Sequence, residues 1–218
     1  MSSPAVLNLW KKNLGNVPAE VWERTDLEVL ILADNGLTEL SDSLGRLSSL
    51  RTLDLGHNRL AALPESIGNL VGLANFLYLH DNRFDVLPAT LERLVKLRYL
   101  NISENEFSEF PTSICKLSSL IELRATDNQL SALPDCIGQL SQLRELHLRN
   151  NRLTTLPPAI AKLSDLRQLD LRGNPLESLP ESIAHLPKLE KLDLRWVNTL
   201  NEPEWLYSLE ARGCVVYR

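Results

Sequence analysis

The sequence repeats a 23-residue pattern of leucines and asparagines along almost its whole length. The stretch 143–157 reads LRELHLRNNRLTTLP, and the same spacing of leucines recurs on both sides of it. Asn105, Asn128, Asn151 and Asn174 follow one another at intervals of 23 residues. A period of this length is typical of a solenoid, in which each coil packs only on its neighbours. The 218-residue chain is therefore interpreted as one elongated domain, over 1–218, rather than two globular ones.

Each repeat contains the elements of one coil: a short strand, a turn and a short helix. Leu146 and Leu148 alternate with polar residues, and this period of two predicts a strand with leucines on one face only. Asn151 follows at the turn, where its amide can hydrogen-bond backbone groups of its own turn and of the next one. After Pro157 the apolar residues lie three apart, which suits a short helical or 3₁₀ segment that begins at the proline. The sequence thus predicts an α/β solenoid.

One interval between repeats is longer than the others. Asn58 and Asn82 are 24 residues apart, so an extra residue lies within 71–76. That residue forms either a longer loop before the strand or a bulge within it. Ser41 also stands where most repeats have a proline.

The two ends depart from the pattern. Lys12 occupies the first asparagine position, and Asn198 comes one place late in the last repeat. A terminal coil must present one face to water, so atypical end repeats are expected. We expect an N-terminal capping repeat over 1–26, regular repeats over 27–197, and a C-terminal cap over 198–218 with a short helix and a closing strand.

The return segment of the coil carries a family resemblance. Residues 63–70 read LPESIGNL, the pattern L-P-x-x-I-x-x-L. This resembles the cytosolic leucine-rich-repeat proteins with 23-residue repeats, of the Ras-suppressor, Scribble-type and plant intracellular Ras-group subfamily, and similar repeats in bacterial proteins. The resemblance covers roughly residues 5–200. It implies a right-handed horseshoe with a concave parallel sheet, short helical or 3₁₀ convex segments, and a protein partner on the concave face.

Charge and hydropathy disfavour two classes of partner. The net charge is −5 and the sequence pI is about 5.5, whereas general nucleic-acid binders are more often basic. Apolar runs are short, and none approaches the ~20 residues of a membrane helix. We therefore expect neither nucleic-acid binding nor membrane insertion.

The first residues and the cysteines favour a cytoplasmic protein. The start lacks a basic segment followed by an apolar one, so no signal peptide is expected. The three cysteines are Cys115, Cys136 and Cys214, an odd count without the clustering typical of secreted repeat caps. Cys115 and Cys136 fall at different positions of their return segments. We therefore expect them not to meet, and to act as reduced, apolar fillers.

Aromatic residues gather at strand positions that point away from the leucines. Phe76, Tyr78, His80 and Tyr99 fall on adjacent predicted strands, with Ile31 nearby. Exposed aromatics on a rigid sheet are favoured anchors for protein interfaces, which is our interpretation here. The alternative is cross-strand packing that only stabilises the sheet.

Basic residues follow on the next predicted strands. This second group contains Arg124, His147, Arg149, Arg172 and Arg195. Arginines at such a spacing suit an acidic segment or a phosphopeptide. The alternative, left open by the sequence, is simple pairing with the acidic residues within reach, which are Glu122, Glu145, Asp170 and Asp193.

A further predicted column is mostly acidic. It contains Asp34, His57, Asp81, Glu104 and Asp127, each directly before a turn asparagine. Such a column could attract a cation, but the residue at this point of a turn is often polar for local reasons. One carboxylate per strand makes no dedicated cage, so we expect no metal site and no cofactor.

The sequence favours a binding protein over an enzyme. It lacks the phosphate-binding, dinucleotide-binding, metalloprotease and paired-cysteine motifs, and its four histidines have no recognisable nucleophile beside them. We expect a monomeric, non-enzymatic scaffold that binds a protein partner on the concave face. The alternative is the recognition domain of a larger effector, kinase or GTPase fusion whose catalytic part lies outside this chain.

Overall fold

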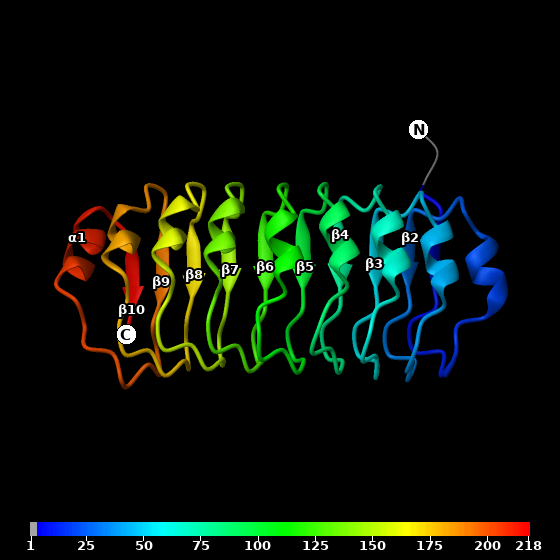
Figure 1. Cartoon of the computed structure of the whole chain (residues 1–218), viewed down its shortest axis with the longest axis horizontal. Coiled ribbons are helices and arrows are strands. Elements are labelled where there is room, and N and C mark those ends of the chain that lie inside the picture. The colour runs from blue at the N-terminus through cyan, green and yellow to red at the C-terminus, as the bar shows by residue number, and fades with distance from the viewer. Residues whose placement is uncertain (1–3) are drawn as a thin grey trace.

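A computed structural model describes residues 4–218 (Figure 1). Ten parallel strands form one open sheet in chain order, and each strand pairs with the strands of the adjacent coils. This confirms the predicted solenoid. The strands are β1 Val6–Asn8, β2 Val29–Ile31, β3 Thr52–Asp54, β4 Phe76–Tyr78, β5 Tyr99–Asn101, β6 Glu122–Arg124, β7 Glu145–His147, β8 Gln168–Asp170, β9 Lys191–Asp193 and β10 Val215–Tyr217.

Short helices form a second layer that covers one face of the sheet (Figure 1). Most start directly after a proline, whose ring fixes φ near the value that the helix needs. Ser41 replaces this proline in η2 and caps the helix instead, because its side chain accepts a hydrogen bond from the Ser43 amide at 3.1 Å. The 3₁₀ helices are η1 Ala19–Glu23, η2 Asp42–Arg46, η3 Glu65–Asn69, η4 Ala89–Arg93, η5 Thr112–Lys116, η6 Asp135–Gln139, η7 Pro158–Lys162 and η8 Glu181–His185.

The leucines fill the space between the two layers. Leu123 and Leu146 are partners in the β6–β7 register, and both are fully buried. Ile137 and Ile160 from η6 and η7 meet this layer from the other side and are also fully buried. Each coil contributes one such layer, so the apolar surface is removed from water only when coils stack.

The asparagines form a buried ladder along the turns. Asn128 donates from Nδ2 to the carbonyl oxygens of Ile102 and Thr126, at 3.0 and 3.2 Å. Its Oδ1 accepts from the amide of Phe107 at 3.2 Å. One side chain thus satisfies backbone groups of its own coil and of the preceding coil. The ladder confirms that these asparagines hydrogen-bond backbone groups of their own turn and of a neighbouring one, but the neighbour is the preceding coil and not the next one.

The extra residue of the 24-residue interval lies in a loop. Thr52 of β3 pairs directly with Phe76 of β4, and the strands remain in register. Ala74 occupies the added position between the turn at 71–72 and the start of β4. The loop interpretation is therefore confirmed, and a bulge in the strand is wrong.

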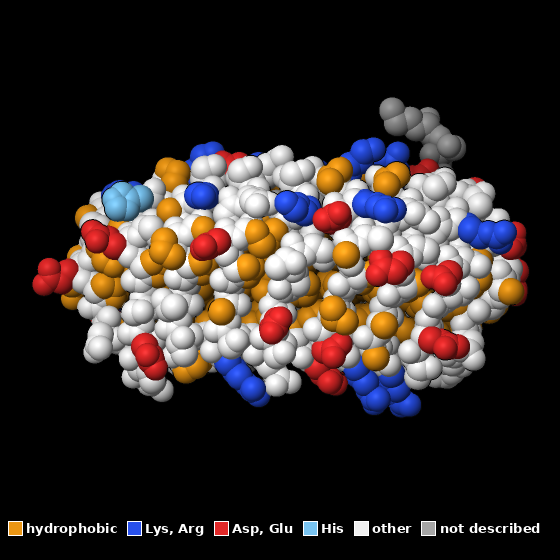
Figure 2. Space-filling view, viewed as in Figure 1, with side chains coloured by type: hydrophobic (Ala, Val, Ile, Leu, Met, Phe, Trp, Pro, Cys, Tyr) orange, Lys and Arg blue, Asp and Glu red, His pale blue; other side chains and the backbone are white. Residues whose placement is uncertain are grey.

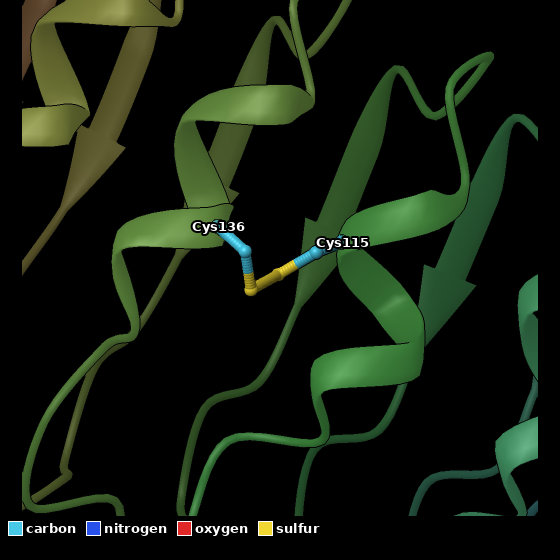
Figure 3. Close-up of a disulfide and its surroundings, with 2 residues drawn as sticks. All are labelled: Cys115 and Cys136. Atoms are coloured by element: carbon cyan, nitrogen blue, oxygen red, sulfur yellow. A yellow bond between two sulfur atoms is a disulfide. The ribbon is translucent and has the colours of Figure 1, made fainter.

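The expectation that Cys115 and Cys136 do not meet is wrong. A disulfide joins them across η5 and η6, with their Cα atoms 5.6 Å apart (Figure 3). Cys115 is the fourth residue of its helix and Cys136 the second of the next one. Neighbouring helices make contact with this offset, so residues at different positions face each other. The cytoplasmic location stays a prediction, and the disulfide removes the cysteine argument for it.

The same offset explains small residues in other helices. Gly45 is the fourth residue of η2, and a Cβ there would lie 2.8 Å from the Cβ of Ser66, the second residue of η3. Gly68, the fourth residue of η3, would likewise bring a Cβ to 2.6 Å from Thr90 of η4. The fourth residue of one helix therefore contacts the second residue of the helix that follows it in the stack.

The chain ends with a helix and a strand beyond the regular coils. The helix α1 spans Trp205–Ala211, and β10 extends the sheet by pairing with β9. Leu206 and Leu209 of α1 are buried against the last coil. Within residues 4–218, no helix has the length and apolar character needed to cross a membrane.

Candidate functional site

The candidate site lies on the open face, by which we mean the sheet face opposite the helices. In each strand from β2 to β9 a buried residue stands between two residues that point to this face. The register of the sheet places Tyr78 beside Asn101, and Arg124 beside His147, as the 23-residue spacing predicts. The predicted binding residues lie on these strands or two residues after them, and are Ile31, Phe76, Tyr78, His80, Tyr99, Arg124, His147, Arg149, Arg172 and Arg195.

Three rings on β4 and β5 form one cluster, which we call the aromatic patch: Phe76, Tyr78 and Tyr99. The Phe76 and Tyr78 rings stack with centroids 5.8 Å apart, and the Tyr99 ring lies 5.4 Å from Phe76 and 5.1 Å from Tyr78. Phe76 remains 42% exposed. Burial raises the pKa of Tyr99 to about 12, so its phenol stays neutral over the physiological range.

A shallow hollow borders the aromatic patch. Its volume is about 270 Å³, and the edges of Phe76 and Tyr99 form part of its wall. The patch therefore both packs across the strands and offers apolar surface to solvent. The other residues that line the hollow are Asn75, Arg98, Ile121 and Glu122.

A pair of histidines extends the patch toward the N-terminal coils. His80 lies 6.1 Å from Tyr78 and 4.6 Å from His57, measured between ring centroids. The His80 ring covers Gly56 so closely that any Cβ at position 56 would overlap with it. Ile31 lines a neighbouring hollow of about 350 Å³ together with both histidines. Ile31 therefore lies beside the histidine pair rather than within the aromatic patch.

The arginines of the open face are each paired with a carboxylate. Arg172 makes a two-pronged contact with Asp170, at 2.8 and 2.6 Å, and Arg195 does the same with Asp193, at 2.9 and 2.8 Å. Arg124 donates from Nε to Glu122 at 2.6 Å. In all three cases the partner lies on the strand, two residues earlier in the chain, so the two side chains point to the same side of the sheet.

Arg149 completes the set with a partner from the preceding coil. It lies 2.9 Å from Asp127, which also accepts a hydrogen bond from Asn150 at 2.7 Å. Because two-pronged pairing satisfies both carboxylate oxygens, an incoming phosphate would have to compete with Asp170 and Asp193. The geometry thus agrees with the pairing alternative, and a direct binding role for the arginines stays a prediction.

Asp170 is the most strongly held carboxylate of this group. It is nearly buried on β8, which by itself would raise its pKa. The hydrogen bonds from Arg172, with help from His147, outweigh burial and hold the pKa of Asp170 well below its usual range. Its charge is therefore a permanent part of the open face.

The residues of the mostly acidic column before the turn asparagines share a left-handed backbone conformation. Asp34, His57, Asp81, Glu104 and Asp127 all have φ between 51° and 57°. Polar residues tolerate this left-handed conformation better than bulky apolar ones. The local explanation for the column is therefore sufficient.

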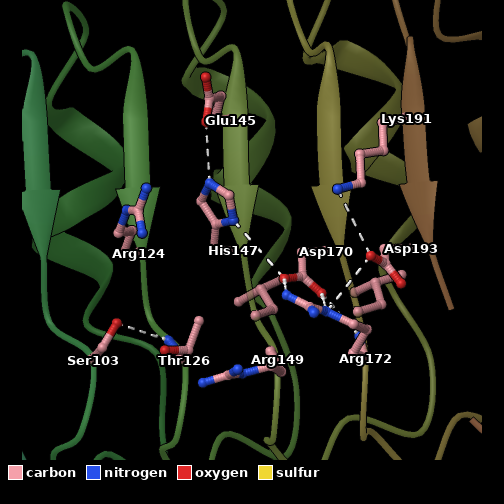
Figure 4. A network of polar contacts seen from close by, with 12 residues as sticks. Ser103, Arg124, Thr126, Glu145, His147, Arg149, Asp170, Arg172, Lys191 and Asp193 are labelled. Carbon is pink, nitrogen blue, oxygen red and sulfur yellow. Dashed lines mark hydrogen bonds and ion pairs between the residues drawn. The ribbon is translucent and has the colours of Figure 1, made fainter. Parts of the chain in front are cut away.

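A different group of potential metal ligands, Glu122, Glu145 and His147, converges on β6 and β7. Figure 4 shows two of them, Glu145 and His147, on β7. The Nε2 atom of His147 lies 3.2 Å from Glu145 and 3.9 Å from Glu122. The sequence analysis considered these carboxylates only as possible partners of the arginines and so missed the group. In the sequence the group could have been recognised from two glutamates 23 residues apart, with a histidine two positions after the second.

The opposite, helix-covered face has a different character. Figure 2 shows acidic and basic side chains scattered over it, some of them side by side, with hydrophobic surface between them. The paired charges and clustered rings described above belong to the open face, which makes that face the candidate site.

Comparison with known proteins agrees with the architecture. A family model described as leucine rich repeat matches residues 5–60, 73–130 and 141–200. No curated protein sequence matches the chain. Among solved structures, the leucine-rich-repeat domain of the type III effector XopL is 30% identical, with 98% of this chain and 75% of that one covered and a TM-score of 0.85.

Two further solved structures are also similar. The ectodomain of the membrane receptor kinase GASSHO1/SCHENGEN3 from Arabidopsis thaliana, solved with CASPARIAN STRIP INTEGRITY FACTOR 2, is 33% identical with a TM-score of 0.75. That match covers 87% of this chain but only 24% of the ectodomain. The PEPR1–AtPEP1 complex shares the fold at 23% identity, with a TM-score of 0.68 over 85% of this chain and 32% of that one.

Proposed function

This chain belongs to the leucine-rich-repeat family, and on that premise we propose that it binds a segment of a protein partner on the open face of its sheet, without catalysing a reaction. Leucine-rich-repeat domains are typically protein-interaction modules. The receptor ectodomain that resembles this chain was solved with a bound partner, CASPARIAN STRIP INTEGRITY FACTOR 2. The subfamily, the cytoplasmic setting and the monomeric state expected from the sequence remain parts of this proposal.

The aromatic patch is the observation that carries the proposal. Three rings lie in mutual contact on adjacent strands, and one of them, Phe76, is substantially exposed. The parallel ladder beneath holds their backbones in place, so little conformational entropy is lost when a partner packs on them. Rigid aromatic groups with a polar edge are enriched at the energetic centres of interfaces.

The paired arginines form the rim of this surface in our proposal. Arg172 and Arg195 already have buried carboxylate partners, so the net field that they present to a partner is small. Rim charges act mainly on the association rate and are screened by salt. We therefore assign the arginines to steering and the aromatic patch to affinity.

The second candidate is that the chain is the recognition part of a larger protein. The similarity to the repeat domain of the effector XopL favours this reading, as does the small share of the plant ectodomain that the chain covers. Binding would still occur on the open face, and any catalytic part would lie outside these residues. A map of the full gene separates this candidate from the first.

A peptide-display selection against the whole chain tests the proposal. Peptides selected on the wild type are titrated against Tyr78→Ala and Tyr99→Ala, with Tyr207→Ala as a matched control because Tyr207 is an exposed tyrosine on α1. Truncating a central anchor costs about 2 kcal/mol or more, so each patch variant should bind at least about 30-fold more weakly. The control should bind like wild type.

An arginine variant defines the contrary outcome. Arg172→Ala should weaken binding mainly at low salt. If both patch variants bind like wild type while Arg172→Ala does not, the arginine half is the site and the aromatic patch only packs the sheet. Circular dichroism checks that every variant is folded, as expected because the leucine layer beneath is unchanged.

A further inference from the structure

Three side chains from two adjacent strands direct potential metal-binding atoms at one point of the open face. Glu122 comes from β6, and Glu145 and His147 come from β7. One ligand atom from each lies within 4.8 Å of the other two. Zinc bonds of about 2.0–2.2 Å in a tetrahedral arrangement place neighbouring ligand atoms ~3.3 Å apart. The distances of 3.2 and 3.9 Å from the His147 Nε2 atom are close to that value.

We propose that Glu122, Glu145 and His147 form a zinc-binding site on the open face. One imidazole nitrogen and two carboxylate oxygens make a set that zinc accepts, whereas magnesium demands six oxygens in a near-octahedral arrangement. Three protein ligands leave a fourth position for water or for a group from a partner. The three side chains are only 16–34% exposed, so they lie partly sheltered on the sheet.

The pairing of the strands supplies an independent reason for a cation. Glu122 and Glu145 are direct neighbours in the β6–β7 register. Like charges at directly opposed positions destabilise a sheet. A divalent cation between the two carboxylates would turn this repulsion into attraction, because each oxygen would then face the ion.

A further carboxylate faces His147 on its other side. Its Nδ1 atom faces the Asp170 carboxylate at 4.0 Å, while Nε2 faces the two glutamates. Arg172 holds that carboxylate in a fixed position. Metal-bound histidines commonly donate their second N–H to a carboxylate, which leaves the lone pair of the first nitrogen for the ion. Here the 4.0 Å separation is longer than a hydrogen bond, so Asp170 attracts this side of the His147 ring electrostatically without fixing it.

Arg124 is the competitor that the proposal has to accommodate. Its Nε atom donates to Glu122 Oε1 at 2.6 Å, the same oxygen that lies nearest to His147. Zinc would have to displace this hydrogen bond or use the second oxygen of Glu122. Removing the guanidinium should therefore tighten zinc binding, a result that a merely structural cluster would not produce.

Calorimetric titration of the whole chain with zinc chloride tests the site. We expect one zinc ion per chain, and His147→Gln, Glu122→Gln and Glu145→Gln should each weaken binding by at least about 10-fold. Arg124→Gln should bind zinc more tightly than wild type. His57→Gln is the matched control, because His57 is also a histidine beside a carboxylate, Asp81, at 2.7 Å. Magnesium chloride in the same titration should bind far more weakly.

Cobalt gives a second readout that does not depend on heat. Four-coordinate Co²⁺ with these ligands should produce visible absorption bands in the wild type and in His57→Gln but not in His147→Gln. The proposal is overturned if the wild type binds no zinc, if His147→Gln binds it like wild type, or if binding is lost in His57→Gln instead. Circular dichroism confirms that the variants compared are folded.

Discussion

The Nε2 atom of His80 lies 3.2 Å from the Nε2 atom of His57. The Nδ1 atom of His57 lies 2.7 Å from the Asp81 carboxylate. Because a carboxylate can only accept, we place the proton of the His57 ring on Nδ1, where it is donated to Asp81. The His57 Nε2 atom then accepts a hydrogen bond from His80. Full protonation of both rings would break this bond and bring two positive charges together.

The first prediction concerns the pH dependence of this pair. Burial, followed by the neighbouring His57, lowers the pKa of His80 below its ordinary value. As the pH falls, the unfolded chain therefore takes up a proton on this histidine before the folded chain does, near pH 6.5. The free energy of unfolding should keep its full value above that pH and decrease below it. Urea unfolding at pH 7.5 and 5.5 should show a smaller loss for His80→Gln than for wild type.

Nuclear magnetic resonance gives the direct check on His80. Its ring should titrate below pH 6.5, and His57→Gln should raise the pKa of His80 because a neighbouring charge is removed. A His80 ring that titrates at or above pH 6.5 would contradict the arrangement described here.

The second prediction concerns the asparagine ladder. Asn128→Ala should lower the free energy of unfolding by about 1–3 kcal/mol, because the buried amide of Phe107 loses its partner. The carbonyl of Ile102 loses one of its two donors and keeps Asn105. Asn69→Ala, an exposed position at the end of η3, is the matched control and should change little. Equal midpoints in chemical denaturation for the two variants would mean that the ladder contributes no stability.

The third prediction concerns the bond between η5 and η6. Purified under oxidising conditions, the chain should contain the Cys115–Cys136 disulfide and a free thiol at Cys214, as peptide mapping by mass spectrometry would show. Reduction should lower the stability by about 2–4 kcal/mol, because the unfolded chain regains the freedom of a 21-residue separation. The double variant Cys115→Ser with Cys136→Ser should be insensitive to the reductant, and two free thiols at these positions after oxidation would refute the pairing.

The fourth prediction concerns the C-terminal segment. Deletion of 198–218 removes β10 and α1 and so leaves the edge of β9 unpaired and the last leucine layer uncovered. Exposed parallel edges and apolar faces promote aggregation. Light scattering should therefore detect association of the truncated chain at concentrations where the full chain stays monomeric. A truncated chain that is equally stable and monomeric would show that this segment is only a tail.

The sequence alone was sufficient for the repeat and for its register. Alternating leucines specify which strand face is buried, and the 23-residue interval brings Tyr99 beside Glu122 and Glu145 beside Gln168. These relations follow from periods of two residues and of one coil, which are local or strictly periodic. The aromatic patch could therefore be located before the structure was known.

The contacts between helices needed the tertiary structure. The fourth residue of one helix meets the second of the next, an offset that no interval in the sequence states. Cys115 and Cys136 obey this rule, as Gly45 does with Ser66. The signal was present as small residues at the fourth position, but its meaning depends on how two helices pack side by side.

The partners of the long side chains were also decided only in three dimensions. The sequence placed Arg124, Arg149 and Arg172 on one face but left open whether they were free or paired. Arg172 turns back to Asp170 of its own coil, whereas Arg149 reaches to Asp127 in the preceding coil. Periodicity determines where each Cβ points, while the rotamers beyond it are set by the charges and space around them. For the same reason, the convergence of Glu122, Glu145 and His147 became visible only in the folded chain.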